Sequence, residues 1–146
     1  MLLQIFFSFF IVSGSYAKTD VEIKAWFLGQ AVECSKDHPV TTEELRMIHK
    51  HELPDSKNAK CLMKCVFRKC NWLDSKGMYD INAAYASSTK DFSDDKTKQE
   101  NANKLFDTCK SVNEENVGDG EEGCDRSLLL AKCLTKAAPQ VSIYYS

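Results

Sequence analysis

Seven cysteines carry the clearest chemical signal in this 146-residue chain. Three of them, Cys61, Cys65 and Cys70, fall within the short stretch that runs from Lys60 to Cys70. Cys61 and Cys65 stand four residues apart, which places both thiols on one face of a helix. Two neighbours on one helical face do not cross-link easily to each other, so each is expected to bond to a different segment. This stretch is therefore predicted to be a central helix that is tied twice to the rest of the chain.

The first 17 residues show the pattern of a cleaved secretory signal peptide. They contain no charged side chain, and their apolar run is too short to span a bilayer. Small residues at Ser15 and Ala17 supply a cleavage site, although the usual Lys or Arg before the apolar run is missing. A retained membrane anchor is the alternative. We expect a secreted, extracellular protein whose residues 18–146 form one domain.

The same cysteines also permit a zinc site. Cys61, Cys65 and Cys70, with His49 or His51, would supply four zinc ligands. Disulfides are favoured instead, because paired cysteines persist in the oxidising compartment that secretion implies. Loss of the fold under mild reductant rather than under a chelator would distinguish the two. We therefore expect neither a metal nor a cofactor.

Charge and motifs argue against two broad classes of function. The formal net charge of -2 is too balanced for nucleic-acid binding as a main activity. No recognisable nucleophile and base, and no paired-carboxylate motif, occurs in the sequence. The chain also lacks the Cys-Cys pair beside a His-Asp constellation that marks a secreted phospholipase. We expect no enzymatic activity and name no catalytic residue.

Apolar periodicity and capping residues predict an all-α fold of about six helices. Asp20 is predicted to cap the first helix, and Thr41 and Glu44 fit a capping box at the start of the second. The segment 113–123 is acidic and contains glycine, so it is predicted to be a loop. The first expected helix runs from Asp20 to about Ser35, and the second from Thr41 to before Pro54. The third runs from Asp55 or Ser56 to about Trp72, and the fourth from Asp80 to a loop at Ser87-Ser88-Thr89. The fifth begins at Ser93–Asp95 and continues through Val112, and the sixth runs from Cys124 to Pro139.

The cysteines of the sixth predicted helix add a geometric constraint. Cys124 and Cys133 are nine residues apart, so they lie on nearly opposite sides of the helix and need different partners. Combined with the two thiols of the central helix, this predicts three crosslinks among six cysteines, namely Cys34, Cys61, Cys65, Cys109, Cys124 and Cys133. Six cysteines allow fifteen connectivities, and spacing alone does not choose between them.

The spacing of these six cysteines resembles the signature of the insect odorant-binding proteins, the pheromone- and general-odorant-binding (PBP/GOBP) family. Successive cysteines are separated by 26, 3, 43, 14 and 8 residues, and the two invariable intervals of the family are both met. The resemblance covers nearly the whole chain after the signal peptide. The departures are a somewhat long interval between Cys109 and Cys124 and the additional Cys70.

This resemblance implies a compact helical bundle around an apolar cavity, stapled by three disulfides. The pairing that it implies joins Cys34 to Cys65, Cys61 to Cys124, and Cys109 to Cys133. Cys70 is then a free thiol. It is either buried or available for an intermolecular disulfide that would give a covalent dimer.

The resemblance also implies a carrier function. The protein would bind small hydrophobic ligands such as odorants or pheromones and transport them through sensillum lymph, with an olfactory receptor as a further partner. A carrier of the same fold for hormones, lipids or plant compounds in haemolymph, saliva or another secretion is the alternative. We expect a monomer or a weak dimer.

Candidate ligand-binding residues are apolar or aromatic side chains that are expected to face the pocket. They are Met47, Met63, Phe67, Leu73, Met78, Ile81, Tyr85, Phe106, Leu130 and Leu134. Flexible methionine side chains suit a pocket that accepts several shapes, but core packing is the alternative for each residue. Ile143 and Tyr144 would join the pocket if the C-terminal tail folds back as a lid, as in some members of the family; a disordered end is the alternative.

The three histidines suggest a hypothesis for ligand release. His38, His49 and His51 would gain charge at about pH 6 and unsettle the packing of the first two helices. The alternative is that they lie on the solvent side. A ligand affinity that does not change between neutral and mildly acidic pH would remove the hypothesis.

Overall fold

The computed structural model describes residues 17–140, and within this range the chain is helical without a β-strand. The α-helices are α1 (Asp20–Cys34), α2 (Thr42–His49), α3 (Lys57–Lys69), α4 (Ile81–Asp91), α5 (Lys96–Thr108) and α6 (Cys124–Ala137). Short 3-10 helices are η1 (Lys110–Asn113), η2 (Gly120–Glu122) and η3 (Ala138–Gln140). The predicted all-α fold is confirmed. The expected signal peptide, apart from Ala17, and the tail with Ile143 and Tyr144 lie outside the described residues.

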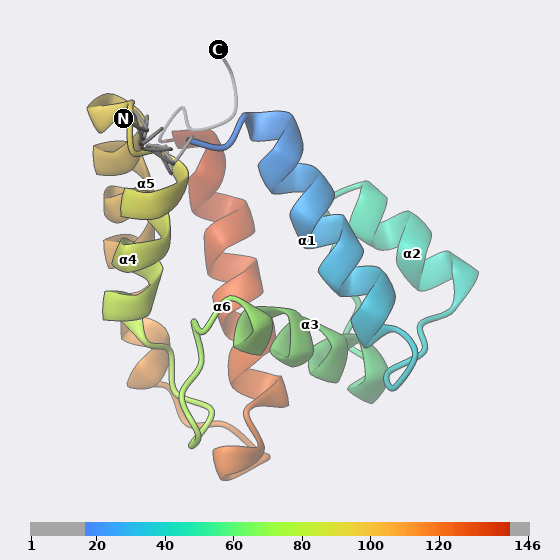
Figure 1. The fold of residues 1–146 in the computed structure, drawn as a ribbon. Helices are drawn as coiled ribbons and strands as arrows, with labels where there is room; N and C mark the ends of the chain where they lie inside the picture. Colours follow the sequence, from blue (N-terminus) through green and yellow to red (C-terminus); the bar gives the residue numbers. More distant parts are fainter. Residues whose placement is uncertain (1–16, 141–146) are drawn as a thin grey trace, which may run out of the picture.

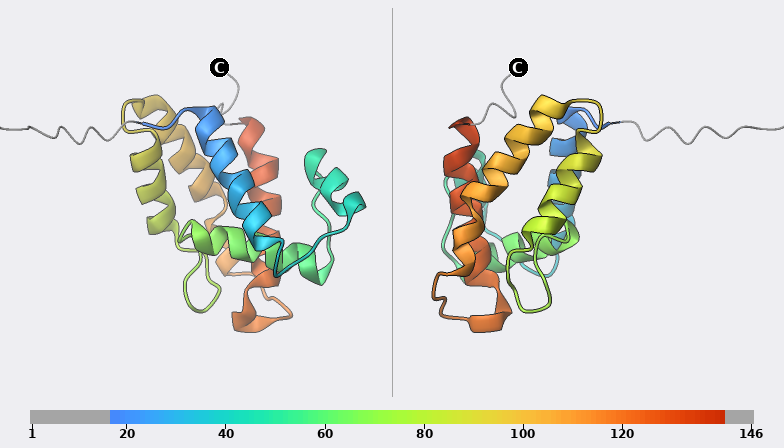
Figure 2. Two further views of the ribbon diagram at one scale, coloured as in Figure 1. Left: turned by 45° about the vertical axis from the view of Figure 1, so that its right-hand side comes forward. Right: turned by 90° about the vertical axis from the view of Figure 1, so that its left-hand side faces the viewer.

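Helix α3 is central to the fold, as predicted. It crosses α6 and also packs against α1, while α4 and α5 lie side by side away from α2 (Figures 1 and 2). Helix α5 also contacts α6, so that the helices enclose one hydrophobic core. Between residues 17 and 140, no helix has the length and apolar character that a membrane span requires.

Capping side chains explain where the first two helices begin. At α2, the backbone N–H of Glu44 donates to Thr41 Oγ1 at 3.2 Å, and the N–H of Thr41 donates to Glu44 Oε2 at 2.7 Å. This confirms the predicted capping box. Helix α1 starts with the same reciprocal arrangement between Thr19 and Glu22. The prediction of Asp20 as the cap is therefore wrong by one residue, because the reciprocal pair satisfies two backbone donors where a single aspartate satisfies one.

Helix α4 continues through residues 87–89, where a loop was predicted. The hydroxyls of these residues donate back to carbonyls of the preceding turn, as Ser88 Oγ does to Tyr85 O at 2.9 Å. Ser88 is buried, and its hydroxyl also lies 2.6 Å from Asn103 Oδ1 on α5. Packing against α5 therefore outweighs the weak helix propensity of serine and threonine.

Helix α3 ends earlier than predicted, at Lys69 instead of about Trp72. Asn71 adopts a left-handed conformation with φ of 61°. The backbone N–H of Asn71 donates to Arg68 O at 3.0 Å, and that of Trp72 donates to Phe67 O at 2.9 Å. These two bonds form a Schellman motif, which turns the chain out of the helix. Helix α5 likewise ends before Val112, which lies in η1.

Three disulfides fix the helices to one another. They are Cys34–Cys65 between α1 and α3, Cys61–Cys124 between α3 and α6, and Cys109–Cys133 between the end of α5 and α6. These are the pairs that the family resemblance implies. The two sulfurs on one face of α3 thus reach two different helices, and α6 is held from two sides. Cys70 keeps a free thiol.

Candidate ligand-binding site

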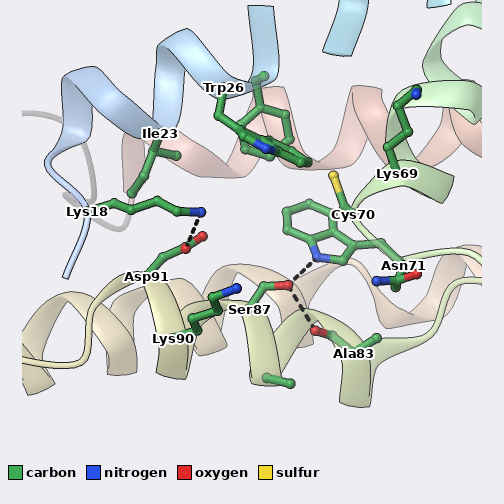
Figure 3. A pocket seen from close by; sticks show the side chains of 13 residues that line it. Lys18, Ile23, Trp26, Lys69, Cys70, Asn71, Ala83, Ser87, Lys90 and Asp91 are labelled. Carbon is green, nitrogen blue, oxygen red and sulfur yellow. Dashed lines mark hydrogen bonds and ion pairs between the residues drawn. The ribbon is translucent and has the colours of Figure 1, made fainter. Parts of the chain in front are cut away.

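A cavity of about 350 Å³ opens between α1, the C-terminal end of α3 and α4 (Figure 3). Its volume lies at the lower end of the roughly 300–1,000 Å³ range of small-molecule pockets. The residues that line it are Lys18, Ile23, Trp26, Phe27, Lys69, Cys70, Asn71, Trp72, Ala83, Ala86, Ser87, Lys90 and Asp91. The space is therefore large enough for a small organic ligand.

Aromatic rings form the apolar wall of this cavity. Trp72 is buried, and its ring centroid lies 6.0 Å from those of both Phe27 and Phe67 and 5.0 Å from that of Phe106. Trp26 packs edge to face against Phe27 at 5.2 Å. Ring pairs of this kind prefer defined orientations, so the core behind the wall holds it in shape. Both tryptophans of the chain line the cavity.

The position of Trp72 depends on hydrogen bonds to α4. Its indole Nε1 donates to Ser87 Oγ at 3.0 Å, and Ser87 Oγ donates to Ala83 O at 3.1 Å (Figure 3). The Trp72 carbonyl also accepts from the N–H of Asp80, the residue that caps α4, at 2.8 Å. These hydrogen bonds fix Trp72, and with it this part of the aromatic wall, between the end of α3 and α4.

Charged side chains gather at one end of the cavity. Lys18 Nζ and Asp91 Oδ1 form an ion pair at 2.8 Å, and the Lys18 N–H donates to Asp91 O at 3.2 Å. The same ammonium group lies 5.6 Å from the centroid of the Trp26 ring, within range of a cation–π contact. Lys90, next to Asp91 on α4, has no ion-pair partner among residues 17–140, and its amine points into the cavity toward Ser87 (Figure 3). The charged end therefore lies directly beside the aromatic wall.

Cys70 places its free thiol on the cavity wall, where the sulfur points toward Trp26 (Figure 3). Its Sγ donates to Val66 O at 3.2 Å. Burial raises the pKa of Cys70 to about 12, and the Asp91 carboxylate adds to the effect. The thiol is therefore protonated at neutral pH and is a poor nucleophile. An intermolecular disulfide through Cys70 stays a prediction, to be checked by non-reducing electrophoresis of wild type against Cys70→Ser.

We expect iodoacetamide at about pH 8 to alkylate Cys70 in the folded protein at least tenfold more slowly than in the denatured, disulfide-intact chain. The reason is the raised pKa, which lowers the thiolate fraction. The alkylation rate of the folded protein should keep rising as the pH increases well beyond 9, because deprotonation is complete only above the folded-state pKa of about 12. A mass-spectrometric time course measures both rates. Equal rates in the folded and denatured protein would contradict the burial of the thiol.

Among residues 17–140, none of the residues predicted to bind ligand lines this cavity. The buried core contains Met63, Phe67, Leu73, Phe106 and Leu130. Ile81, Tyr85 and Leu134 pack at the edge of that core, and Met47 lies half-buried on α2. The Tyr85 hydroxyl donates to Asp107 Oδ1 at 2.5 Å, which occupies its donor. Ligand binding by these residues stays a prediction, and the cavity residues that periodicity missed are Trp26, Phe27 and Trp72.

A second hollow of about 430 Å³ lies among the loops before α6. Its lining residues are Lys76, Met78, Glu115, Asn116, Val117, Gly120, Glu121 and Arg126. Met78 is the one predicted ligand-binding residue among these. The Arg126 guanidinium is buried, and its Nη1 donates to the carbonyl oxygens of Val112 and Glu115. Without an aromatic wall, this hollow is less suited to an apolar ligand than the first cavity.

The geometry of the cysteines bears on the zinc alternative. Among residues 17–140, one group of three potential metal ligands lies close together, namely Cys61, Glu122 and Cys124. The two sulfurs of this group are bonded to each other, and Cys65 is bonded as well. A cysteine binds zinc as its thiolate, so the sulfurs that form these disulfides are not available as zinc ligands.

The three histidines lie away from the cavity. His38 is half-buried in the turn after α1, where its backbone N–H donates to Cys34 O at 3.0 Å, while His49 and His51 are exposed. None of them lines either hollow described above. Acid-promoted release through these histidines stays a prediction.

Known proteins resemble this chain in sequence and in fold. The family model of the PBP/GOBP family matches residues 17–137. General odorant-binding protein 19d of Drosophila melanogaster is 24% identical over 104 residues, which make up 71% of this chain and 66% of that protein, slightly under two thirds of its length. The structure of the odorant-binding protein dmelOBP28a from the same fly superposes with a TM-score of 0.61 at 24% identity, covering 82% of this chain and 94% of that one. Odorant Binding Protein 4 of the predator Chrysopa pallens gives a TM-score of 0.66 at 23% identity, with 87% and 97% covered.

Proposed function

Because the chain belongs to the PBP/GOBP family, we propose that it is a secreted carrier that binds small hydrophobic ligands in the cavity between α1, α3 and α4. The observation that carries this proposal is the wall formed by Trp26, Phe27 and Trp72 beside a space of about 350 Å³. Transfer of apolar ligand surface from water to such a wall is favourable by about 25 cal/mol per Å². The family consists of carriers rather than enzymes, which agrees with the lack of a catalytic motif.

The disulfide frame supports the same function. A cavity inside a protein normally lowers stability in proportion to its volume. The bonds Cys34–Cys65 and Cys61–Cys124 fix α3 to α1 and to α6, so the end of α3 that lines the cavity is held in place without side chains that fill the space beside it. Such a frame allows an open binding site in a chain of this size.

We infer that the ligands are odorants or pheromones, carried through sensillum lymph to an olfactory receptor by a monomer or a weak dimer. The relatives named as odorant-binding proteins support this assignment. A carrier of hormones, lipids or plant compounds in haemolymph or saliva would use the same cavity. Immunostaining separates the two: protein in antennal sensilla supports the olfactory role, and protein confined to haemolymph or salivary gland contradicts it.

The two tryptophans offer a direct test of ligand entry. Since both line the cavity, a ligand that enters it changes the environment of every indole in the chain. We expect hydrophobic volatiles to quench or shift the tryptophan emission in a saturable way and to displace a bound fluorescent naphthylamine probe. A panel of volatiles and longer lipids that neither changes the emission nor displaces the probe would argue against a carrier.

A substitution that narrows the cavity should weaken binding without touching either tryptophan. Ala83 lines the cavity on α4, and we expect Ala83→Leu to raise the Kd for the best ligand at least about fivefold, because the added atoms occupy the ligand's space. Ala25→Leu is the matched control, since Ala25 is exposed on α1 and does not line the cavity. Fluorescence titration of both variants measures the effect. Wild-type affinity in Ala83→Leu would place the ligand elsewhere.

A further inference from the structure

The charges around the cavity are unbalanced in favour of cations. Among the described residues that line it, Lys18, Lys69 and Lys90 are cationic and Asp91 is the one carboxylate, so their side chains carry a net charge of +2. The chain as a whole carries a formal charge of -2. A cleft whose charge opposes that of the whole molecule attracts ligands of the complementary sign.

The three ammonium groups differ in their carboxylate partners and in their place in the cavity. Lys18 pairs with Asp91 at 2.8 Å. Lys69 lies at the other end of the cavity, and its amine points away from Lys18 and Asp91 (Figure 3). Lys90 has no ion pair within the described part of the chain; it lies on the same helix as Asp91, and its amine points into the cavity toward Ser87 (Figure 3). The side chains of Lys18, Lys90 and Asp91 together leave one positive charge at the end of the cavity where they lie.

Building on the carrier function proposed above, we propose that the cavity selects amphiphiles with a single carboxylate head. The head accepts hydrogen bonds from Lys90 and Lys18, and the apolar chain lies along Trp26 and Trp72. The geometry suits this division, because the Lys18 ammonium lies only 5.6 Å from the Trp26 ring centroid. A monoanion neutralises the one excess side-chain charge at this end, whereas a dianion would leave a net negative charge beside Asp91 and a cation would be repelled by Lys90.

A cavity lined by cations reverses the order of affinities that an uncharged cavity would show. An ionised carboxylate loses more hydration on burial than a hydroxyl does, so an apolar site without cations binds an alcohol more tightly than the carboxylate of equal chain length. Charge-assisted hydrogen bonds to ammonium groups are roughly twice as strong as neutral ones and offset this loss. The comparison of decanoate with decanol therefore tests the head group while the chain length stays fixed.

The experiment titrates the full chain with decanoate and decanol at about pH 8 and low salt, where the carboxylate is ionised, and follows the tryptophan emission. We expect decanoate to bind about tenfold more tightly, and added salt to reduce that ratio. Lys90→Met should lower the decanoate-to-decanol preference to about one or below, because it removes the unpaired charge and keeps the length of the side chain. Asp91→Asn should raise the preference. Lys104→Met is the matched control, since Lys104 is an exposed lysine on α5 that does not line the cavity.

The outcomes separate this inference from the function on which it rests. Decanol binding as tightly as decanoate, or more tightly, overturns the carboxylate preference and leaves the carrier function standing. A preference that persists unchanged in Lys90→Met also overturns the assignment, because the head must then lie elsewhere. If neither compound nor any member of the volatile panel changes the tryptophan emission, the carrier function itself fails.

Discussion

Replacing Cys61 and Cys124 together by alanine is expected to lower the free energy of unfolding by about 4 kcal/mol. The two cysteines are 63 positions apart, the largest separation among the three disulfides. Opening a longer loop returns more entropy to the unfolded chain. Both cysteines are also buried, so the alanines leave unfilled space between α3 and α6. Guanidinium denaturation followed by circular dichroism measures the loss.

The matched control removes a shorter loop. Cys109 and Cys133 are 24 positions apart, and the same double replacement is expected to cost about 3 kcal/mol on the same loop-entropy argument. Both variants keep two disulfides and the free Cys70. A smaller loss for the Cys61 and Cys124 variant than for the control would show that loop length does not set the order of stabilisation in this fold.

Gly123→Ala is expected to cost about 3 kcal/mol of stability, because it combines backbone strain with a steric clash. Gly123 precedes α6 with φ of 81°, and it faces Gly77, whose φ is 70°. A β-carbon built on Gly123 would lie 2.8 Å from the Gly77 Cα, too close for any real contact. Because the clashing atom belongs to the backbone, a side-chain rotation does not relieve it. Thermal denaturation measures the loss.

Gly120→Ala separates the clash from the conformational strain. Gly120 also has a positive φ, 55°, but a β-carbon there meets nothing within 4 Å. Its replacement is expected to cost only the strain of a left-handed alanine, about 1 kcal/mol. Equal losses of stability in Gly120→Ala and Gly123→Ala would mean that the steric clash with Gly77 does not contribute to the destabilisation by Gly123→Ala.

Helix starts were predictable because capping is a local interaction. Thr41, Ser56 and Asp80 each cap the helix that the sequence placed after them, and all three accept from a backbone N–H three residues later. The continuation of α4 through Ser88 was not predictable in this way. It depends on Asn103, which reaches Ser88 only once α5 lies against α4.

The candidate site was harder to predict than the fold. Apolar periodicity selects side chains such as Met63 and Phe106, and these do lie inside, but as parts of the solid core. A cavity forms where packing is incomplete, and its place depends on how α1 sits against α4. Lys18 and Asp91, which meet at its charged end, are far apart in sequence and join only through that tertiary arrangement. The sequence held one further indication of the site. Both tryptophans of the chain line the cavity, and neither was among the residues chosen from periodicity.

The placement of Cys70 on the cavity wall has a consequence for biosynthesis. In a newly made, unfolded chain, Cys70 is an ordinary thiol close in sequence to Cys61 and Cys65, and it competes for their partners by thiol–disulfide exchange. Its low reactivity exists only after α1 and α4 have closed around it, because burial is the main cause of the raised pKa. The residues around the cavity therefore lower the reactivity of the Cys70 thiol in addition to forming a binding surface. In the folded protein, burial of Cys70 also protects the three native disulfides from exchange with the seventh cysteine.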